Sequence, residues 1–290
     1  MPELPEVLTT INYLKPRVLK KTITKVWIDK NTKIDNQTSK DFSKQLQNSK
    51  IIKIDNIGKY IIFYLSNNLL LIIHQKISGH LLFGNYIQKT NSWACQNKNI
   101  SQDPNNRFIR ILFLLSSGQS LALSDPRRLI RITLVSKDNF SKINAINKIG
   151  PDPFSKEFSL DFFVKKLSSH QKLTVKQGLL NQNIVAGIGN IYADEILFKS
   201  KILPFRKIST LHKKEIYAIF KNINIVLLNA LKNKGTTFSN YRNPNGKSGQ
   251  NQTTLKVYGR KNLPCTKCKE KIQSIKINNR GSYFCAKCQK

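Results

Sequence analysis

Four of the five cysteines lie in the last 26 residues of this 290-residue chain, as two Cys-x2-Cys pairs: Cys265 and Cys268, then Cys285 and Cys288. Each pair forms a short turn that directs two thiolates at one metal ion, so the spacing predicts one structural Zn²⁺ in a tetrahedral site. Disulfides are the alternative, but the thiols of a cytosolic chain stay reduced. Because four thiolates leave no open position for a substrate, the ion is expected to fold the tail and take no part in a reaction.

The segment 272–284 between the two pairs predicts two short strands joined by a turn at Asn279-Arg-Gly281. Such a hairpin would present Arg280 at its tip, where a guanidinium can bind a phosphate through two parallel hydrogen bonds. A solvated arginine without a ligand is the alternative for any single arginine on a basic surface. The fifth cysteine, Cys95, is expected to be a packed or surface thiol without a role.

The rest of the chain predicts a β-rich half followed by a helical half. Short β-branched segments separated by Asn, Gly and Ser turns are typical of an antiparallel sandwich or barrel. They occur at residues 23–28, 51–54, 60–65, 69–73, 108–115 and 119–123. An amphipathic helix precedes them, with Val7, Ile11, Leu14 and Val18 at helical spacing, and helical patterns dominate residues 157–234. We therefore expect an α+β fold.

The expected domain limits follow from these patterns. We expect a β-sandwich domain with a leading helix over residues 1–135, a linker over 136–153, a helical domain over 154–250 and a zinc finger over 251–290. The linker contains Ile149-Gly-Pro-Asp-Pro153, a rigid segment that breaks regular secondary structure. No internal repeat is visible in the sequence.

The chain is strongly basic. It has 49 Lys and Arg against 16 Asp and Glu, for a formal net charge of +33, so phosphate polyanions such as nucleic acids are the expected partners. A genome rich in A and T would raise the lysine content, but it would not explain why glutamate is scarce. Membrane surfaces are the competing partner, yet the chain has no run of about 18 apolar residues and no signal peptide. We therefore expect a soluble cytoplasmic protein without a membrane partner.

Pro2 follows the initiator Met1, and removal of Met1 would leave a secondary amine at the start of the chain. An α-amino group has a pKa of about 7.7 to 8.0, against about 10.4 for lysine, so more of it is an unprotonated nucleophile near neutral pH. Its condensation with a sugar aldehyde carbon gives an iminium that withdraws electrons at any pH. Glu3 and Glu6, spaced i and i+3, lie on one face if a helix begins here. In the alternative interpretation, Pro2 simply begins an ordinary helix.

Two glycine-containing segments of the helical half are candidate ligand contacts. The run from Val185 to Phe198 places two glycines and Asn190 directly before an apolar helix, where backbone amides are exposed to a phosphate, although Asn190 can equally cap the helix. The polar segment 235–249 is either a mobile flap over a bound nucleotide or a surface loop without a function.

Together these features resemble the bacterial formamidopyrimidine-DNA glycosylases, also called 8-oxoguanine DNA glycosylases, along essentially the whole chain. Each shared motif is weakly specific alone, but their joint order is highly specific. The motifs are Pro2-Glu-Leu-Pro-Glu-Val7, Gly58-Lys-Tyr60, Asp125-Pro-Arg-Arg128, Gly150-Pro-Asp-Pro153, Ala186-Gly-Ile-Gly-Asn-Ile-Tyr192, Val257-Tyr-Gly-Arg260 and the zinc tail.

The resemblance implies a DNA repair enzyme with an N-terminal antiparallel β-sandwich, a helix-two-turn-helix domain and a C-terminal zinc finger hairpin. It would act as a monomer, without an obligatory protein partner, on double-stranded DNA that contains oxidised bases or abasic sites. The damaged purine, chiefly 8-oxoguanine opposite cytosine or a formamidopyrimidine, would be flipped out of the stack. Mature Pro2 would attack the anomeric carbon, displace the base and form an iminium, and elimination on both sides of the sugar would nick the strand.

The resemblance also implies roles for single residues. The expected catalytic residues are Pro2, Glu3, Lys59 and Arg280. Among them, Glu3 matches the acid that protonates the sugar ring oxygen, while Glu6 matches a second acidic position with an orienting role. Phosphate contacts around the lesion are implied at Lys59, His74, Asn190 and Arg280, and further DNA contacts at Arg127, Arg128 and Lys176. From the sequence alone, His74 could be a satisfied strand-end histidine and Lys59 one solvated lysine among many.

The chain departs from the family where the extruded base leaves a hole in the duplex. The family fills that hole with methionine, arginine and phenylalanine, and the matching residues here are Ile77, Arg127 and Leu129. Ile77 and Leu129 can still wedge between bases, but leucine has no ring that stacks, so lesion search could be slower while the chemistry survives. A lysine and histidine cluster of the family reads Asn105-Asn-Arg-Phe108 here, and no function is carried over to it.

Two other functions stay open at this point. A related endonuclease VIII type of enzyme would act on oxidised pyrimidines, but its opening usually has glycine where this chain has Leu4. A zinc-dependent DNA-binding protein that has lost catalysis is the second alternative. It would bind DNA in a strongly salt-dependent way without nicking a strand.

Overall fold

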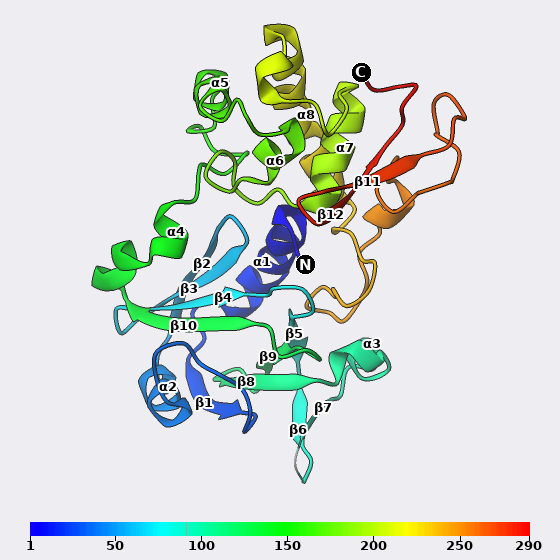
Figure 1. The fold of residues 1–290 in the computed structure, drawn as a ribbon. Coiled ribbons are helices and arrows are strands. Elements are labelled where there is room, and N and C mark those ends of the chain that lie inside the picture. The colour runs from blue at the N-terminus through cyan, green and yellow to red at the C-terminus, as the bar shows by residue number, and fades with distance from the viewer. Residues whose placement is uncertain (91) are drawn as a thin grey trace. The chain divides into compact units, whose positions relative to one another are not determined.

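The computed structural model describes residues 1–90 and 92–290 (Figure 1). The chain forms two compact units, each built from two separate stretches of sequence. Unit 1 comprises residues 1–144 and 233–252, and unit 2 comprises residues 145–232 and 253–290. Unit 1 is rich in strands, whereas unit 2 is mainly helical and contains the hairpin of the C-terminal tail.

Unit 1 contains two four-stranded sheets, and neighbouring strands in both are antiparallel. The first sheet consists, in spatial order, of β1 (Ile23–Ile28), β8 (Ile109–Leu115), β9 (Ser120–Ser124) and β5 (His80–Gly84). The second consists, in spatial order, of β10 (Arg131–Ser136), β4 (Leu69–His74), β3 (Tyr60–Leu65) and β2 (Ile51–Ile57).

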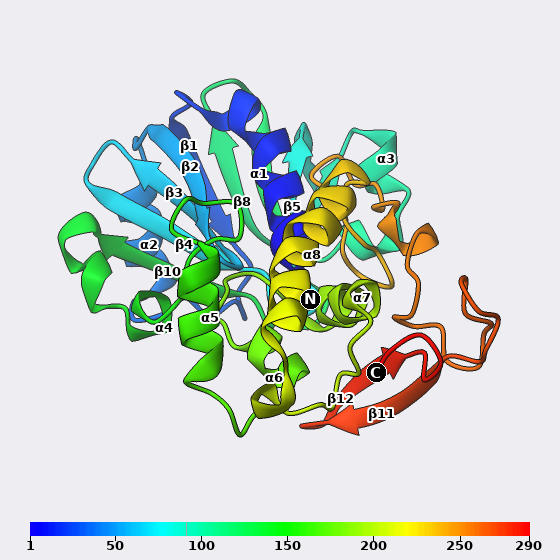
Figure 2. The same ribbon diagram turned by 90° about the horizontal axis from the view of Figure 1, so that it is seen from above.

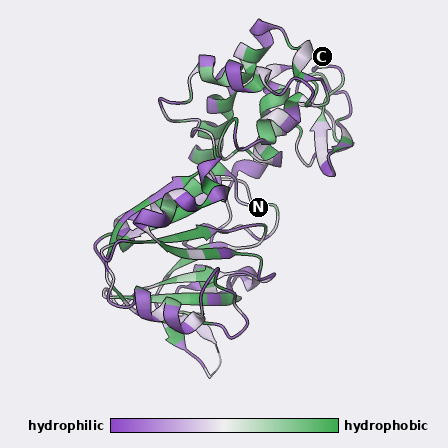
Figure 3. Cartoon of the chain, turned by 60° about the vertical axis from the view of Figure 1, so that its left-hand side comes forward, coloured by the Kyte–Doolittle hydropathy of each residue, from purple (hydrophilic) through white to green (hydrophobic). Residues whose placement is uncertain are grey.

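The two sheets share one hydrophobic core. Alternate residues of the strands point into it, such as Ile111 and Phe113 from β8 and Leu71 and Ile73 from β4. Burial of each such side chain contributes about 1.5 to 3 kcal/mol, which favours stacking of the sheets face to face. Figure 3 shows hydrophobic residues concentrated in these strands. The expected α+β class with an antiparallel sandwich is therefore confirmed.

Helix α1 (Leu4–Val18) packs on β2 and β3 and belongs to the same core. Its buried residues include Val7, Ile11, Leu14 and Val18, at the spacing that the sequence predicts. Because this face of the helix is anchored along its whole length, the N-terminal residues that precede it are held at a fixed place on the sandwich.

Short elements complete unit 1. They are α2 (Ser39–Leu46), β6 (Tyr86–Gln88), β7 (Trp93–Cys95), α3 (Lys98–Ser101), η1 (Pro104–Asn106) and η2 (Lys137–Lys142), and α4 (Asn144–Asn147) follows. Strands β6 and β7 pair with each other. Cys95 is buried with Leu82 and Ile100 in a small apolar cluster, which makes it a packed thiol, one of the two states that the sequence allows.

Residues 233–252 pack in unit 1, although the sequence pattern assigns residues up to 250 to the helical domain. The amide of Phe83 in β5, an edge strand, donates to the carbonyl of Pro244 at 2.8 Å. Arg242 forms an ion pair with Asp103, and Asn243 is also buried. The segment 235–249 is therefore packed in this structure and is not a freely solvated loop. It leads into η4 (Asn251–Thr253).

The helices of unit 2 are α5 (Leu160–Ser168), α6 (Val175–Leu180), α7 (Asn190–Ser200) and α8 (Lys213–Lys232), with a short η3 (Ile208–Thr210). Ser159 caps α5 by accepting a hydrogen bond from the Phe162 amide, as expected for a serine at this position. Helix α7 packs against α6 and α8, and Figures 1 and 2 both show it beside α8. Among the helices of the described part of the chain, none is both long and apolar enough to cross a bilayer.

The C-terminal hairpin consists of β11 (Gln273–Ile277) and β12 (Arg280–Phe284). The turn residues are Asn278 and Asn279, with φ angles of 46° and 58°, a left-handed conformation that asparagine tolerates in two-residue hairpin turns. The turn therefore lies one residue earlier than the sequence predicts, and Arg280 is the exposed first residue of β12. Phe198 of α7 packs with Cys265, Ile272 and Cys285 against the base of this hairpin.

His80 is a polar residue at the buried start of β5. Its side chain is fully buried, and its Nε2 lies 3.0 Å from Oδ1 of Asn106, so the neutral imidazole donates a hydrogen bond to this oxygen. Burial lowers the pKa of His80 to about 4, against the opposing effect of this hydrogen bond. The unfolded chain regains a histidine pKa near 6.5. Between pH 6.5 and 4 the unfolded state therefore binds a proton that the folded state does not.

We expect the free energy of unfolding of unit 1 to fall as the pH is lowered from 6.5 to 4, and His80 to contribute roughly 3 kcal/mol of this loss. Urea unfolding at several pH values, followed for the chain and its His80→Gln variant, measures this contribution. The variant should be less acid-sensitive. Equal pH dependence in both proteins would contradict the assignment.

Candidate functional site

The start of the chain forms a buried acidic site at the N-terminus of α1. Pro2, Glu3 and Glu6 are all buried, and Glu3 is the residue that caps the helix, with extended backbone angles. The amide of Glu3 donates to Oε2 of Glu6 at 2.8 Å. This arrangement places both carboxylates, as the i and i+3 spacing predicts, within one helical turn of the amine that removal of Met1 would free.

Glu6 is also held by the segment 233–252. Its Oε1 accepts a hydrogen bond from the Thr236 amide at 2.7 Å, and the Tyr241 hydroxyl donates to its carbonyl at 3.2 Å. Gly235 has a φ of 79°, and an added Cβ there would lie only 2.8 Å from Oε1 of Glu6. The close approach therefore requires glycine at 235. Because both of its oxygens accept backbone amides, Glu6 is suited to hold the site in position.

Lys59 joins this cluster from the turn between β2 and β3. Gly58 takes a φ of 54° in that turn, and Lys59 is only 7% exposed. Burial lowers the pKa of the Met1 α-amino group, Glu3 and Glu6 oppose this effect, and the Lys59 ammonium adds to it. The amine, the two carboxylates and the lysine are therefore close enough to interact electrostatically within unit 1.

His74 ends β4, opposite Tyr60 in the sheet, and the two rings meet edge to face at a centroid distance of 4.7 Å. Nδ1 of His74 accepts a hydrogen bond from the Lys76 amide at 3.0 Å. Burial lowers the pKa of His74 to about 4, and the Lys76 and Lys59 ammonium groups lower it further. A neutral imidazole with Nδ1 as acceptor carries its proton on Nε2, which can donate to a ligand.

The three residues that match the family's hole-filling positions lie on two loops of unit 1. Ile77 and Leu129 are 49% and 37% exposed, and Arg127 is exposed. Arg128 is ion-paired with Asp29 and has a φ of 55°, and its expected contact with DNA stays a prediction. This structure thus leaves Arg127 as the freer of the two cations.

In unit 2, Lys176, Asn190 and Arg280 meet at the zinc hairpin. The carbonyl of Gly281 accepts hydrogen bonds from Nζ of Lys176 at 2.9 Å and from Nδ2 of Asn190 at 2.8 Å. Helix α7 is capped by Gly189, so Asn190 does not serve as the helix cap that the sequence allows. Both bonds fix the residue that follows Arg280, whose exposed guanidinium is thereby presented at the start of β12.

Lys176 is fully buried, a position that differs from the exposed DNA contact implied by the resemblance. Its ammonium lies 2.6 Å from Oδ1 of Asp194, and Oδ2 of Asp194 accepts the Tyr283 amide at 2.9 Å. Burial raises the pKa of Asp194 to about 7, against the effect of the Lys176 ammonium. In this conformation Lys176 supports the hairpin, and a direct contact with DNA stays a prediction.

Asp194 and Glu195 were not recognisable as site residues in the sequence. Glu195 accepts backbone amides from Lys256, Val257 and Tyr258 at 2.9 to 3.0 Å, which ties the segment before the zinc finger to α7. Burial raises the pKa of Glu195, and these amides oppose the shift. The available signal was a pair of acids within the otherwise apolar segment 191–198.

The four cysteines of the tail form a cluster that fits one tetrahedral ion. Their sulfur atoms all lie within 4.8 Å of one another, with Cys265 and Cys288 at 3.9 Å and Cys268 and Cys285 at 3.4 Å. Zn–S bonds of about 2.3 Å in a tetrahedron require sulfur separations of about 3.8 Å. The donor set is therefore that of a closed structural zinc site.

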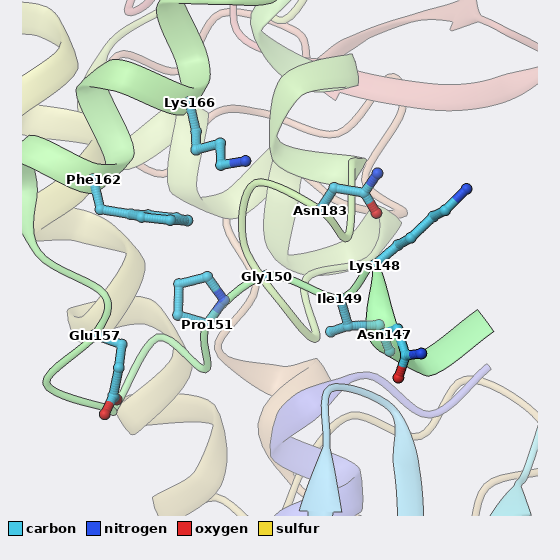
Figure 4. A pocket seen from close by; sticks show the side chains of 9 residues that line it. All are labelled: Asn147, Lys148, Ile149, Gly150, Pro151, Glu157, Phe162, Lys166 and Asn183. Atoms are coloured by element: carbon cyan, nitrogen blue, oxygen red, sulfur yellow. The ribbon is translucent and has the colours of Figure 1, made fainter. Parts of the chain in front are cut away.

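A separate pocket of unit 2 lies beside the 147–151 segment (Figure 4). Figure 4 shows Phe162 and Lys166 on one side and Asn183 on another, and the Lys166 ammonium lies 5.8 Å from the Phe162 ring centroid. Among the described residues that line this pocket, none is an expected site residue. No role in the expected chemistry is therefore assigned to it.

Replacement of Cys268 by serine should abolish stoichiometric zinc binding and unfold residues 262–290, because the binding free energy of a structural zinc, about 10 to 16 kcal/mol, is the folding energy of such a tail. Zinc release measured with a chromogenic chelator, together with limited proteolysis, tests this. Cys95→Ser is the matched control and should keep one zinc. A folded, protease-resistant tail in Cys268→Ser would contradict the assignment.

Three family models match consecutive parts of the chain. The Formamidopyrimidine-DNA glycosylase N-terminal domain matches residues 1–132, and the Formamidopyrimidine-DNA glycosylase H2TH domain matches residues 149–242. The zinc finger found in FPG and IleRS matches residues 262–290. With the sulfur geometry above, this third match confirms the expected single structural Zn²⁺.

Similar proteins match the chain over its full length. Formamidopyrimidine-DNA glycosylases of Ureaplasma parvum and Mycoplasma mobile are 37% and 38% identical to it over 289 residues, which cover 100% of this chain and 100% and 99% of theirs. The crystal structure of MutM (Fpg) from Thermus thermophilus has a TM-score of 0.82 and 31% identity, covering 99% of this chain and 98% of that one. A Lactococcus lactis Fpg in complex with DNA containing an abasic site has a TM-score of 0.85 and 29% identity, covering 99% of both chains. The chain therefore belongs to the formamidopyrimidine-DNA glycosylase family of DNA repair enzymes.

Proposed function

We propose that the chain is a bifunctional glycosylase and abasic-site lyase that removes oxidised purines, chiefly 8-oxoguanine and formamidopyrimidines, from duplex DNA. The observation that carries this proposal is the buried cluster of the N-terminal amine, Glu3, Glu6 and Lys59 in unit 1. After removal of Met1 it would supply a secondary amine as nucleophile and two carboxylates beside it, which are the groups that base displacement at a sugar carbon requires.

In the first step, the nitrogen of mature Pro2 attacks the anomeric carbon of the flipped nucleotide, and the bond from that carbon to the base breaks. Glu3 protonates the sugar ring oxygen, so the ring opens and the nitrogen lone pair forms an iminium with the carbon. Glu6 accepts a hydrogen bond from the Glu3 amide and so fixes the position of Glu3. The cationic iminium then acts as the electron sink for the next step.

In the second step, loss of a proton from C2′, next to the iminium, gives an enamine that expels the 3′ phosphate, and loss of a proton from C4′ then expels the 5′ phosphate. Water then releases the sugar fragment and regenerates the amine. Each departing phosphate is a stable dianion or monoanion that cations stabilise. Lys59, buried beside the amine, is suited to this role in unit 1, and Arg280 is suited to it in unit 2.

DNA contacts are proposed on both units. His74, as a neutral Nε2–H donor, and Lys59 would bind phosphates from unit 1, while Asn190 and Arg280 would do so from unit 2. Two structures of the Lactococcus lactis Fpg, one of them a single-site mutant, are complexes with DNA containing Fapy-dG or an abasic site, which supports DNA with such lesions as the substrate. The charge of +33 adds a sequence-independent attraction.

Arg127 and the exposed Ile77 and Leu129 would fill the space that the flipped nucleotide leaves. An oxidised-pyrimidine complex of the Lactococcus lactis relative keeps pyrimidine lesions as a second substrate class. Release of each base from matched lesion duplexes would rank the two classes.

Borohydride trapping on a lesion duplex tests the proposed nucleophile. The chain should form a covalent adduct, whereas Pro2→Gln should not, because a glutamine at this position retains Met1 and leaves no secondary amine at the terminus. Pro5→Ala, which alters the next proline of the same segment, is the control and should still be trapped. DNA binding by the chain without any adduct would favour a protein that has lost catalysis.

Glu3→Gln should slow base release by about 10²- to 10⁴-fold, the usual contribution of a general acid, and leave DNA affinity within a few fold. Single-turnover excision rates and a binding titration measure the two effects. Glu270→Gln, at an exposed glutamate of the zinc tail, is the matched control and should change neither. A large loss of affinity in Glu3→Gln, with little change in rate for bound DNA, would make Glu3 structural.

A further inference from the structure

Two exposed apolar side chains of unit 1 come from separate loops. Ile77 lies on the loop of residues 75–79 between β4 and β5, and Leu129 lies on the loop of residues 125–130 between β9 and β10. Their exposed fractions are 49% and 37%. A buried carboxylate links these two loops.

That carboxylate belongs to Asp125, whose side chain is fully buried. Its Oδ1 accepts hydrogen bonds from the Ser78 hydroxyl and, at 3.0 Å, from the Arg127 amide. Its Oδ2 accepts the amides of Leu129 at 2.6 Å and Ile130 at 2.9 Å. Four hydrogen bonds converge on this one buried side chain, and the one from Ser78 joins the two loops.

The two loops also interlock sterically. A Cβ added to Gly79 would lie 2.2 Å from Cδ1 of Ile130 and 2.6 Å from the carbonyl oxygen of Gln75. The loops therefore approach so closely that only glycine fits at position 79. Ser78 is itself fully buried, so the hydroxyl that crosses between the loops is shielded from water.

Asp125 is in turn fixed by its own backbone. Its amide donates to the Phe108 carbonyl at 2.9 Å, and its carbonyl accepts Nε of Arg110 at 2.7 Å. Asp125 directly follows β9, so the carboxylate is anchored to the first sheet of the sandwich. The amides of Arg127, Leu129 and Ile130 therefore bind a carboxylate that is fixed to the first sheet.

Side chains that separate stacked bases are effective only if they stay in one conformation on insertion. Unstacking of a base step is unfavourable, and a tip that must first be ordered loses part of its binding free energy to that ordering. A carboxylate that holds Ile77 and Leu129 through both loops supplies this order in the free protein.

We propose that Asp125 and Ser78 are positioning residues that lock Ile77 and Leu129 into one preformed wedge for opening duplex DNA. This inference rests on the proposed function. It assigns the pair to extrusion of the damaged nucleotide and gives it no part in the reaction at Pro2. Loss of the hydrogen bond between the loops should therefore slow reactions that require a base to be unstacked. It should not slow reactions at a site that has no base.

Ser78→Ala is the cleaner variant, because it removes the bond between the loops and leaves the three backbone amides on Asp125. Asp125→Asn is the stronger one, since an amide nitrogen would face hydrogen-bond donors. Ser49→Ala is the control. Ser49 is equally buried in unit 1, and its hydroxyl donates to the Leu46 carbonyl away from both loops.

The test compares two substrates in the same flanking sequence. Base release from 8-oxoguanine paired with cytosine requires extrusion of a stacked, paired base, whereas nicking at a preformed abasic site has no base to unstack. Ser78→Ala should slow the first reaction roughly 10- to 100-fold relative to the second, the effect expected when a positioned group is displaced. Ser49→Ala should slow neither. Equal slowing of both reactions, or of neither, would overturn the proposal.

Hydrogen exchange of the free protein tests the clamp without DNA. In Ser78→Ala, the amides of Leu129 and Ile130 should exchange faster than in the unaltered chain, although the substitution lies on the other loop. Unchanged exchange there would overturn the clamp itself. If the unaltered chain failed to nick an abasic duplex, the proposed function would fail, while the exchange result would still decide whether the two loops are linked.

Discussion

The hydrogen bonds of one buried carboxylate, that of Glu6, hold together the proposed active site at the N-terminus of α1. Glu6 accepts the Glu3 amide at one oxygen and the Thr236 amide at the other, so it joins the first residues of the chain to a segment more than two hundred residues later. A buried charge is stable only when its hydrogen-bonding capacity is met, and backbone amides meet it here. This link helps to fix Glu3 and the N-terminal amine, beside Lys59 from the turn between β2 and β3.

The same use of acids recurs elsewhere in the fold. Asp125 accepts backbone amides of the loop of residues 125–130, and Glu195 accepts three backbone amides of the segment before the zinc finger. Of the 16 acidic residues, five are buried: Glu3, Glu6, Asp125, Asp194 and Glu195. Most lysines and arginines lie outside, so scarce carboxylates organise loops within the protein while the surface stays cationic. A cationic surface with buried carboxyl groups suits an enzyme that binds a polyanion and uses an acid in its active site.

Local signals in the sequence were enough for the zinc ligands, for α1 and for most strands of the sandwich. Strand β5 was missed because it is buried on both faces and shows no alternation, and β10 was missed because its ends are charged and polar. Lys176 could not be recognised as buried, since its partner Asp194 comes from another helix. The packing of residues 233–252 in unit 1 was equally hidden, because polar composition favours a solvated loop while the hydrogen bonds that hold it are long-range.

The position of the sugar in the trapped adduct identifies the nucleophile directly. Lys59 is the rival nucleophile, since it is a buried lysine in the same cluster. Peptide mass spectrometry of the borohydride-reduced adduct should place the deoxyribose fragment on an N-terminal peptide that begins with Pro2, with Met1 absent. A fragment attached to Lys59, or an adduct peptide that still begins with Met1, would contradict the assignment of Pro2 as the nucleophile.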